Sequence, residues 1–305
     1  MNYKTFFGKV IKKLKYHHLF DWMPDELYLK VMFWACMYRK LDLKNPKSFN
    51  EKLQWLKLYD HNPEYTRMVD KYEAKKFVTE KIGKQYIIPT LGIWDGFDEI
   101  NFEILPQQFV LKCTHDSGGL VICKDKANLN LAKTKKKIEK SLETNYFLNG
   151  REWPYKNVKP RILAEKYMED SKAKELIDYK FFCFNGVAES VMVCTERQTG
   201  EPKFYFFDKE WRLKKYNYRG KMAPADFTLP KPNCMDTMFS IAEKLSEGIP
   251  YVRVDLYCID GMIYFGEMTF YPDSGFDSNL LPESDAYWGE MLVLPEKKVK
   301  KNGRK

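Results

Sequence analysis

Short runs of alternating apolar and polar residues fill the second half of the chain, which is the spacing of β-strands that bury one face. The sequence predicts strands within 162–169, 175–184, 187–196, 203–215, 251–259 and 262–270. Two connections carry hairpin residues, Asn185-Gly186 and Ile259-Asp260-Gly261, because Asn, Asp and Gly tolerate the positive φ angles of tight turns. We therefore expect these strands to pair as antiparallel hairpins.

A three- to four-residue apolar spacing, typical of helices, dominates the first part of the chain. It runs from Pro24 to about Tyr59 and is interrupted at Asn45-Pro46. Further helices are predicted at 70–81, about 129–145 and about 236–247, and Gly83 is placed to end the first of them.

The remaining segments complete an α+β pattern. A strand-like run lies at 87–92, and 109–124 reads as a strand, a glycine-containing turn and a second strand. We therefore predict antiparallel sheet in two places, about 105–168 and 175–280, with a ligand cleft between them.

Two acidic side chains stand on neighbouring strands of the last predicted hairpin. Asp255 follows Val254, and Glu267 lies between apolar residues of the next strand. Like charges held close together require a cation, and Mg²⁺ binds through one or two carboxylates together with substrate phosphates. We predict a metal–phosphate site here. Two solvated acids on a surface hairpin are the alternative, which the apolar flanks disfavour.

Lys112 interrupts the apolar run 109–113, and a buried ammonium group needs an anionic partner. The turn at 116–119 contains Gly118 and Gly119, which let the backbone approach a ligand and direct N–H groups at its oxygens, so phosphate is the predicted partner. A plain hairpin would need the same glycines. Residues 165–168 end a strand and offer backbone groups to a purine edge, and Asp178 can accept from a ribose hydroxyl. A solvent-facing role is the alternative for both.

The composition is that of a globular protein, and the net charge is positive. The chain has 305 residues, 44% of them hydrophobic, and a net charge of +9. Neither a membrane-spanning run nor a signal peptide is evident, so we expect a cytoplasmic protein. Residues 1–18 combine five lysines with apolar residues at helical spacing, which predicts either peripheral contact with the anionic inner membrane surface or a packed first helix. No nucleic-acid-binding motif accompanies the charge, so nucleic acid is not an expected partner.

These segments in this order resemble the ATP-grasp superfamily and, more narrowly, the TupA-like ATP-grasp proteins of bacterial surface-polysaccharide pathways. The resemblance runs from about Phe49 to Phe276 and is carried by SFNEKLQWLKLYD, DKYEAKKFVTEKIG, IIPTLGIWD, FVLKCTHDSGG, ILAEKYMED, LIDYKFFCFNG and VRVDLYCIDGMIYFGEMTFYPDSGF. It implies an ATP-grasp fold with a small antiparallel lid subdomain, a larger α+β core and a helical N-terminal region. The implied divisions are a helical region at 1–69, the nucleotide lid and linker at 70–168, the core with the metal site at 169–290 and a basic tail at 291–305.

The resemblance also implies nucleotide-binding roles. Lys75 and Lys112 would contact ATP, with Lys112 at the α and β phosphates. The remaining implied contacts are a flexible phosphate loop of Ser117, Gly118 and Gly119, an adenine hinge of Glu165, Lys166, Tyr167 and Met168, and a ribose contact from Asp178.

The implied metal ligands are Asp255 and Glu267, and Arg253 would stabilise charge on an acyl phosphate and its tetrahedral successor. Thr269 stands where such sites usually have an asparagine as third ligand, and its hydroxyl can bind Mg²⁺ directly or through water. The N-terminal Rossmann-like domain of many ATP-grasp ligases is not evident, and a helical region takes its place.

The implied function is ATP-dependent ligation of a carboxylate to an amine, with ATP and Mg²⁺ as cofactors. The expected acid is a hexuronic acid of a capsule, O-antigen or wall polymer, or its nucleotide-sugar precursor, and the expected amine is an amino acid or small amine. A sugar kinase could use the same residues. A glycosyltransferase would be expected to carry a D-x-D pair, which the sequence lacks. The non-enzymatic alternative is an ATP-responsive binding module.

Overall fold

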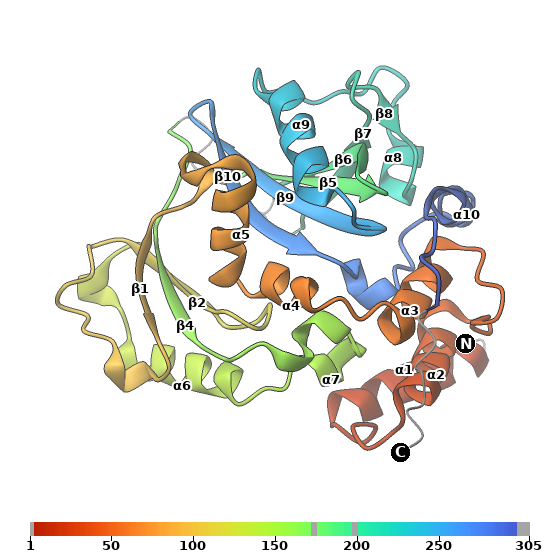
Figure 1. Cartoon of the computed structure of the whole chain (residues 1–305), viewed down its shortest axis with the longest axis horizontal. Helices are drawn as coiled ribbons and strands as arrows, with labels where there is room; N and C mark the ends of the chain where they lie inside the picture. The colour runs from red at the N-terminus through yellow and green to blue at the C-terminus, as the bar shows by residue number, and fades with distance from the viewer. Residues whose placement is uncertain (1–2, 172–175, 197–200, 298–305) are drawn as a thin grey trace, which may run out of the picture.

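The computed structural model describes residues 3–171, 176–196 and 201–297. Two antiparallel sheets with helices around them make up the molecule, which confirms the predicted α+β class (Figure 1). Part of the predicted basic tail, 298–305, lies outside the described residues. The division into a helical region, lid, core and tail remains a prediction. None of the helices in the described ranges is long and apolar enough to cross a membrane.

The larger sheet has the strand order β10-β9-β5-β6-β7-β8. Its strands are β5 (Asp178–Phe184), β6 (Val187–Thr195), β7 (Lys203–Phe207), β8 (Leu213–Lys214), β9 (Tyr251–Ile259) and β10 (Met262–Thr269). Both predicted hairpins are confirmed. The turn residues Asn185-Gly186 and Asp260-Gly261 all have positive φ angles, as a tight turn with two left-handed residues requires.

Both faces of the larger sheet are covered, so every residue of β5 is buried. Phe181 faces α9 (Met235–Ser246) and packs on Phe239 with ring centroids 4.9 Å apart. The next residue, Phe182, faces the other way and packs on Trp288 of α10 (Pro282–Met291) at 4.8 Å. Helix α5 (Glu73–Ile82) lies beside α9 and ends at Gly83 as predicted, where the φ angle is positive.

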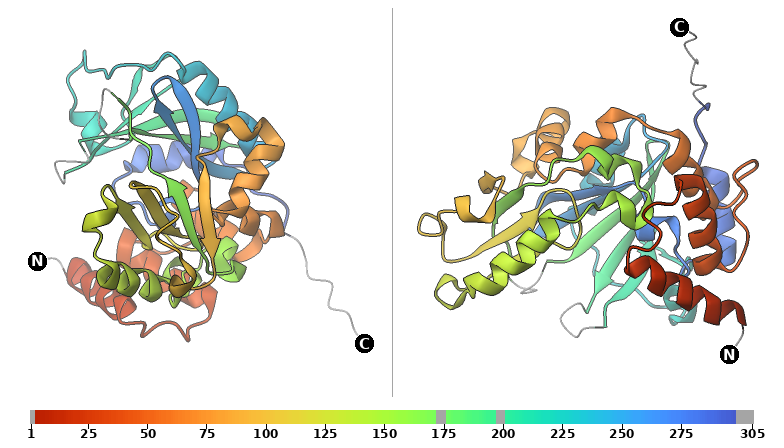
Figure 2. Two further views of the ribbon diagram at one scale, coloured as in Figure 1. Left: turned by 90° about the vertical axis from the view of Figure 1, so that its left-hand side faces the viewer. Right: turned by 90° about the horizontal axis from the view of Figure 1, so that it is seen from below.

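The smaller sheet has the order β1-β4-β2-β3. Its strands are β1 (Thr90–Trp94), β2 (Phe109–Cys113), β3 (Leu120–Cys123) and β4 (Ile162–Lys166). Because β1 pairs with β4, this sheet begins at residue 90 rather than near the predicted 105. Helix α6 (Leu131–Leu142) covers one face through the fully buried Ile138 (Figure 2). Two short helices, α7 (Phe147–Gly150) and α8 (Tyr218–Met222), complete the connections.

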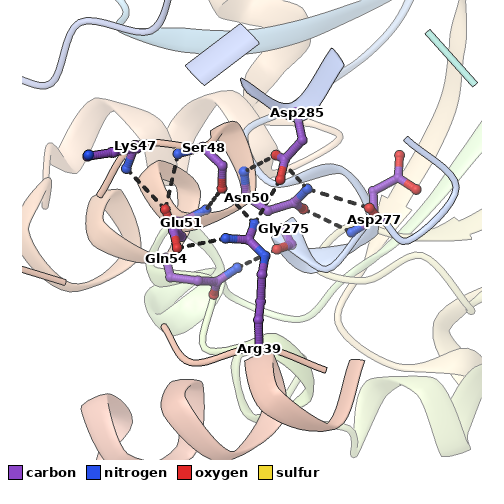
Figure 3. Close-up of polar contacts among 9 residues, drawn as sticks. All are labelled: Arg39, Lys47, Ser48, Asn50, Glu51, Gln54, Gly275, Asp277 and Asp285. Atoms are coloured by element: carbon purple, nitrogen blue, oxygen red, sulfur yellow. Dashed lines mark hydrogen bonds and ion pairs between the residues drawn. The ribbon is translucent and has the colours of Figure 1, made fainter. Parts of the chain in front are cut away.

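The N-terminal region is helical, as predicted, with α1 (Tyr3–Tyr16), α2 (Asp25–Met37), α3 (Phe49–Tyr59) and α4 (Pro63–Val69). Helix α3 begins with a capping box, in which the Ser48 hydroxyl accepts from the Glu51 backbone N–H and the Glu51 carboxylate accepts from that of Ser48. Arg39 donates to Glu51 at 2.7 Å and to Asp285 of α10 at 2.8 Å (Figure 3). Buried carboxylates require a charged or hydrogen-bonded partner, and Arg39 is this partner for an acid of α3 and an acid of α10. These contacts therefore join the N-terminal region to α10.

Asn50 extends this polar network to the loop after β10. Its backbone N–H and its side-chain amide both donate to Asp285 Oδ1 at 2.9 Å, and its Oδ1 accepts from the backbone N–H of Asp277 at 3.0 Å (Figure 3). Burial and the nearby charge of Asp273 raise the pKa of the Asp277 carboxyl from 3.8 to about 6. The charged form of Asp277 is therefore less favourable in the folded chain than in the unfolded chain.

Replacing Asp277 with asparagine is expected to raise the free energy of unfolding by about 1–3 kcal/mol near neutral pH. Because the folded-state pKa is raised, protonated Asp277 makes its full contribution to wild-type stability below about pH 4. This contribution is lost as the pH rises through about 6. Urea unfolding at about pH 7.5 and about pH 4 measures the difference, which should shrink at the lower pH. Glu283→Gln, on the exposed surface of α10, is the control. An equal gain at both pH values would contradict this assignment.

Candidate functional site

A polar cleft of about 300 Å³ lies between the two sheets and is lined by residues of both. A cleft is therefore present where the sequence placed one, between the two sheets. A larger and less polar cavity of about 600 Å³ adjoins it. The two spaces share Ile88, Lys112, Leu120, Glu165 and Tyr257.

Asp255 and Glu267 line the polar cleft from neighbouring strands and are directly paired in the register of β9 and β10. A register shift between Phe265 and Glu267 marks a bulge at Gly266. The two carboxylates differ in exposure, since the Asp255 side chain is 2% exposed and that of Glu267 is 46% exposed. Only Glu267 is thus open to solvent, although both carboxylates face the same space.

Arg253 connects all three residues predicted to bind metal. Its guanidinium binds Asp255 through two hydrogen bonds of 2.7 and 2.8 Å and donates to Glu267 at 3.1 Å and to the Thr269 hydroxyl at 3.0 Å. Burial alone would raise the pKa of Asp255, but the charges of Arg253 and Lys180 and their hydrogen bonds hold it below its usual value. Asp255 is therefore ionised, and Arg253 is fixed by three side chains.

Lys180 is a residue of this site that the sequence reasoning missed. It stands directly opposite Asp255 in the register of β5 and β9, and its ammonium group donates to the Asp255 carboxylate. A second acid, Asp178, lies 3.3 Å from the same ammonium group. The available signal was the spacing of Asp178 and Lys180, which puts two charged groups on one face of a strand that is otherwise apolar.

On the opposite side of the cleft, Glu165 holds the two lysines that were predicted to bind nucleotide. The Glu165 carboxylate lies 2.5 Å from Lys75 Nζ and 2.6 Å from Lys112 Nζ. Burial would raise the pKa of Glu165, but these two lysines lower it. Burial lowers the pKa of Lys75, and Glu165 partly offsets this effect. The two ammonium groups therefore share one counter-charge.

The predicted glycine turn forms one rim of the cleft. Asp116 shapes it, because its carboxylate accepts from the Gly119 backbone N–H at 3.0 Å and from the Ser141 hydroxyl of α6. A Cβ atom on Gly119 would collide with Ser141 and with the Cys113 thiol, so the glycine is required for close packing. The other two loop residues differ: the Ser117 hydroxyl lies 3.1 Å from that of Tyr146, whereas Gly118 does not line the cleft.

Lys71 is a second cleft residue that the sequence reasoning missed. Its ammonium group donates to the backbone carbonyls of Cys113 and Asp116, the first at 3.1 Å. These two bonds hold the start of the glycine turn in place. Burial lowers its pKa, and the charge of Glu267 counteracts this effect. The neighbouring sequence contains several similarly spaced lysines, so nothing distinguished Lys71 from solvated neighbours.

The predicted hinge residues divide between the two spaces. Lys166, Tyr167 and Met168 line the larger cavity, where strand β4 ends. The backbone N–H of Lys166 is already bonded to Pro89 O at 3.0 Å. Glu165 lines both spaces, and its side chain points to the lysines. Asp178 lines the polar cleft, and its register partner Tyr257 lines both.

The chain is similar to a known protein family. A family model described as TupA-like ATPgrasp matches residues 51–293. A search of curated proteins finds no match.

Solved structures whose backbone partly matches that of this chain include three ligases. D-alanine–D-alanine ligase from Bacillus anthracis complexed with ATP is 15% identical, with a TM-score of 0.44 over 73% of this chain and 60% of that chain. The same enzyme from Helicobacter pylori is 12% identical, with a TM-score of 0.43 over 81% and 70%. The ATP-grasp ligase PsnB, complexed with a phosphomimetic variant of its minimal precursor, Mg and ADP, is 9% identical, with a TM-score of 0.42 over 80% and 65%. This chain thus spans 60% of the Bacillus anthracis enzyme.

Replacing Glu165 with glutamine is expected to lower the free energy of unfolding by about 1–3 kcal/mol, because two ammonium groups lose their shared counter-charge. A bound triphosphate would supply negative charge to the same lysines, so the loss should shrink at saturating MgATP. Thermal unfolding with and without MgATP measures both values. Glu139→Gln on α6, where the acid pairs with Lys135 at 3.6 Å, is the control. A loss of the same size with and without MgATP would contradict contact between these lysines and the nucleotide.

Proposed function

We propose that this chain, which belongs to the TupA-like ATP-grasp family, is an ATP-dependent, ADP-forming ligase that joins a carboxylate to an amine. The observation that carries the proposal is the meeting, in one cleft, of Asp255 and Glu267 from the larger sheet with two lysines. These are Lys112 of the smaller sheet and Lys75 of α5. Acids able to hold a divalent cation and lysines able to hold phosphates are the two parts that phosphoryl transfer requires.

The adjoining cavities suit the two halves of ATP. The larger cavity would take adenine, with Tyr167 and Met168 contributing backbone groups, since the Lys166 N–H is engaged with Pro89. The triphosphate would lie in the polar cleft beside Lys75 and Lys112, covered by the turn at Ser117–Gly119. Asp178 would meet the ribose, a placement supported by its pairing with Tyr257 at the junction of the two cavities.

The donor set fits Mg²⁺. Asp255 and Glu267 offer two carboxylates and Thr269 a hydroxyl on adjacent strands, and a hard cation bound this way completes its shell with phosphate oxygens and water. These three residues would hold the ion, which when bound neutralises charge on the phosphoryl oxygens. The proposed set has only two acids, and the described part of the chain contains no group of three or more His, Cys, Asp or Glu side chains that could hold a metal without the help of a substrate phosphate.

The reaction would proceed in two displacements. A carboxylate oxygen of the acid attacks the γ-phosphorus of ATP, ADP leaves, and an acyl phosphate forms. The amine nitrogen then attacks the acyl carbon, inorganic phosphate leaves, and the amine loses a proton as the amide forms. Arg253, already oriented by Asp255, Glu267 and Thr269, would stabilise negative charge in both steps.

For the substrates, we propose a hexuronic acid or its nucleotide-linked form as the acid, and an amino acid or small amine as the acceptor. The resemblance to proteins of surface-polysaccharide pathways supports this choice. The net charge of +9 is compatible with an anionic sugar or polymer. We also propose that the enzyme works in the cytoplasm.

A screen of hexuronic acids and UDP-hexuronic acids against amines, read by ADP release and mass spectrometry, tests the proposal. A ligase releases ADP and phosphate and forms an amide only when both substrates are present. Phosphate retained on the sugar would instead identify a kinase. If the protein binds nucleotide but no combination of acid and amine gives turnover, the result favours a binding module.

Glu267→Gln should lower turnover by on the order of 100-fold or more, because it removes a charged metal ligand and one partner of Arg253. Titration of Mg²⁺ against initial rate should show a raised requirement for the metal, whereas the melting temperature should stay close to wild type, since Glu267 is half-exposed. Glu247→Gln removes another solvent-exposed acid, which pairs with Lys81 at 3.6 Å, and should leave turnover unchanged. Full activity of the Glu267 variant would remove it from the metal site.

A further inference from the structure

Helix α1 and the turn after it carry an unusual number of exposed apolar side chains. We call them the N-terminal apolar surface: Phe6, Phe7, Val10, Tyr16, Leu19 and Trp22. The most exposed are Trp22, at 78%, and Tyr16, at 76%. The helix lies at the outer edge of the molecule, away from both sheets (Figure 2). Clustered exposed apolar residues on a folded protein mark an interaction site more often than isolated ones do.

The exposure of this surface follows from how α1 packs. Gly8 faces α2, and a Cβ atom there would lie 2.7 Å from Ala35 O and 2.9 Å from the Tyr38 ring. Because an α-helix has about 3.6 residues per turn, the side that carries Phe6 and Val10 points away from α2. Helix α1 is therefore packed against the protein by one side and apolar on another.

The turn that presents Leu19 and Trp22 is held by the body of the protein. Arg151 is buried, and its guanidinium donates to the carbonyls of Phe20, Asp21 and Met23 at 2.9–3.2 Å. The Trp22 indole N–H donates to Leu19 O at 2.9 Å. The apolar side chains are thus presented in a preorganised arrangement, which reduces the entropy lost on binding.

Positive charge borders the part of this surface that α1 carries. The sequence contains no acid before Asp21, and Lys9, Lys12 and Lys13 on α1 are exposed. Lys13 lies on the same outward side of the helix as Phe6. Aromatic and aliphatic residues bordered by lysines match the boundary of an anionic bilayer, where apolar groups enter the acyl region and ammonium groups contact lipid phosphates.

We propose that the N-terminal apolar surface docks the protein on a membrane that contains anionic lipids. Charge complementarity selects this partner, since α1 carries three exposed lysines and no acid, and a face of this kind would repel a second copy of itself. The one acid of the following turn, Asp21, is paired with His18 at 3.0 Å. Phe6, Phe7 and Trp22 enter the interface, and Lys9, Lys12 and Lys13 contact the headgroups. This docking does not depend on the reaction that the cleft performs.

Co-sedimentation of the full chain with vesicles tests the proposal. Vesicles of phosphatidylcholine alone are compared with vesicles that also contain phosphatidylglycerol, at low and at high salt. We expect at least tenfold tighter binding to the anionic vesicles at low salt, and weaker binding as salt rises. No binding, or equal binding to both kinds of vesicle, would overturn the proposal.

Two sets of variants locate the contact. Phe6→Ser/Phe7→Ser/Trp22→Ser and Lys9→Glu/Lys12→Glu/Lys13→Glu should each weaken binding at least tenfold without changing the melting temperature. The matched controls are Tyr218→Ser/Met222→Ser, which removes exposed apolar residues of α8, and Lys133→Glu/Lys136→Glu/Lys140→Glu, which reverses exposed charges of α6. Controls that lose as much binding as the test variants would overturn the assignment. A wild-type dimer that the aromatic variant dissociates would show that a second copy covers the surface instead.

Discussion

Charge neutralisation among buried side chains at the cleft is the constraint on which this structure depends. Asp255 is ionised although it is almost fully buried, because Arg253 and Lys180 lie against its two oxygens. Glu165 performs the converse task and holds two lysines together. Each group would be costly to bury alone, and removal of one partner leaves the other uncompensated. The register of β5, β9 and β10 therefore determines which charged side chains neutralise one another, as well as the shape of the cleft.

The sequence was sufficient for features that depend on local chemistry. The Asp260-Gly261 turn sets the pairing of β9 with β10 as far as Phe265, and regular pairing from there would place Gly266 opposite Asp255. The bulge at Gly266 brings Glu267 opposite Asp255 instead, and the sequence reasoning had not identified this bulge. Lys112 was recognisable because it interrupts an apolar strand. Lys180 was not, because its partner lies on β9, and the pairing of β5 with β9 joins segments far apart in the chain. Strand β4 was ambiguous for another reason: its residues 162–165 are all buried, so alternation could not show which way Glu165 points.

The interpretation of the N-terminal segment as a packed helix is confirmed, and this packing leaves room for the membrane contact that we propose. One side of α1 packs against α2 through Gly8, as a structural helix would, and the outward side keeps its apolar residues in solvent. Helical periodicity indicates that a segment is amphipathic but does not say which side meets the protein. That information came from the close approach at a single glycine, which no periodicity measures.

The polar junction between α3 and α10 has a consequence for where the folding unit begins. The segment that matches the family starts at residue 51, whereas Arg39 and Ser48, which bind Glu51, and Asn50, which binds Asp285, all precede it. A recombinant fragment cut at the boundary of sequence similarity would keep both carboxylates and discard the groups that balance them. Expression trials or domain grafts should therefore retain α2, although the family match begins only at residue 51.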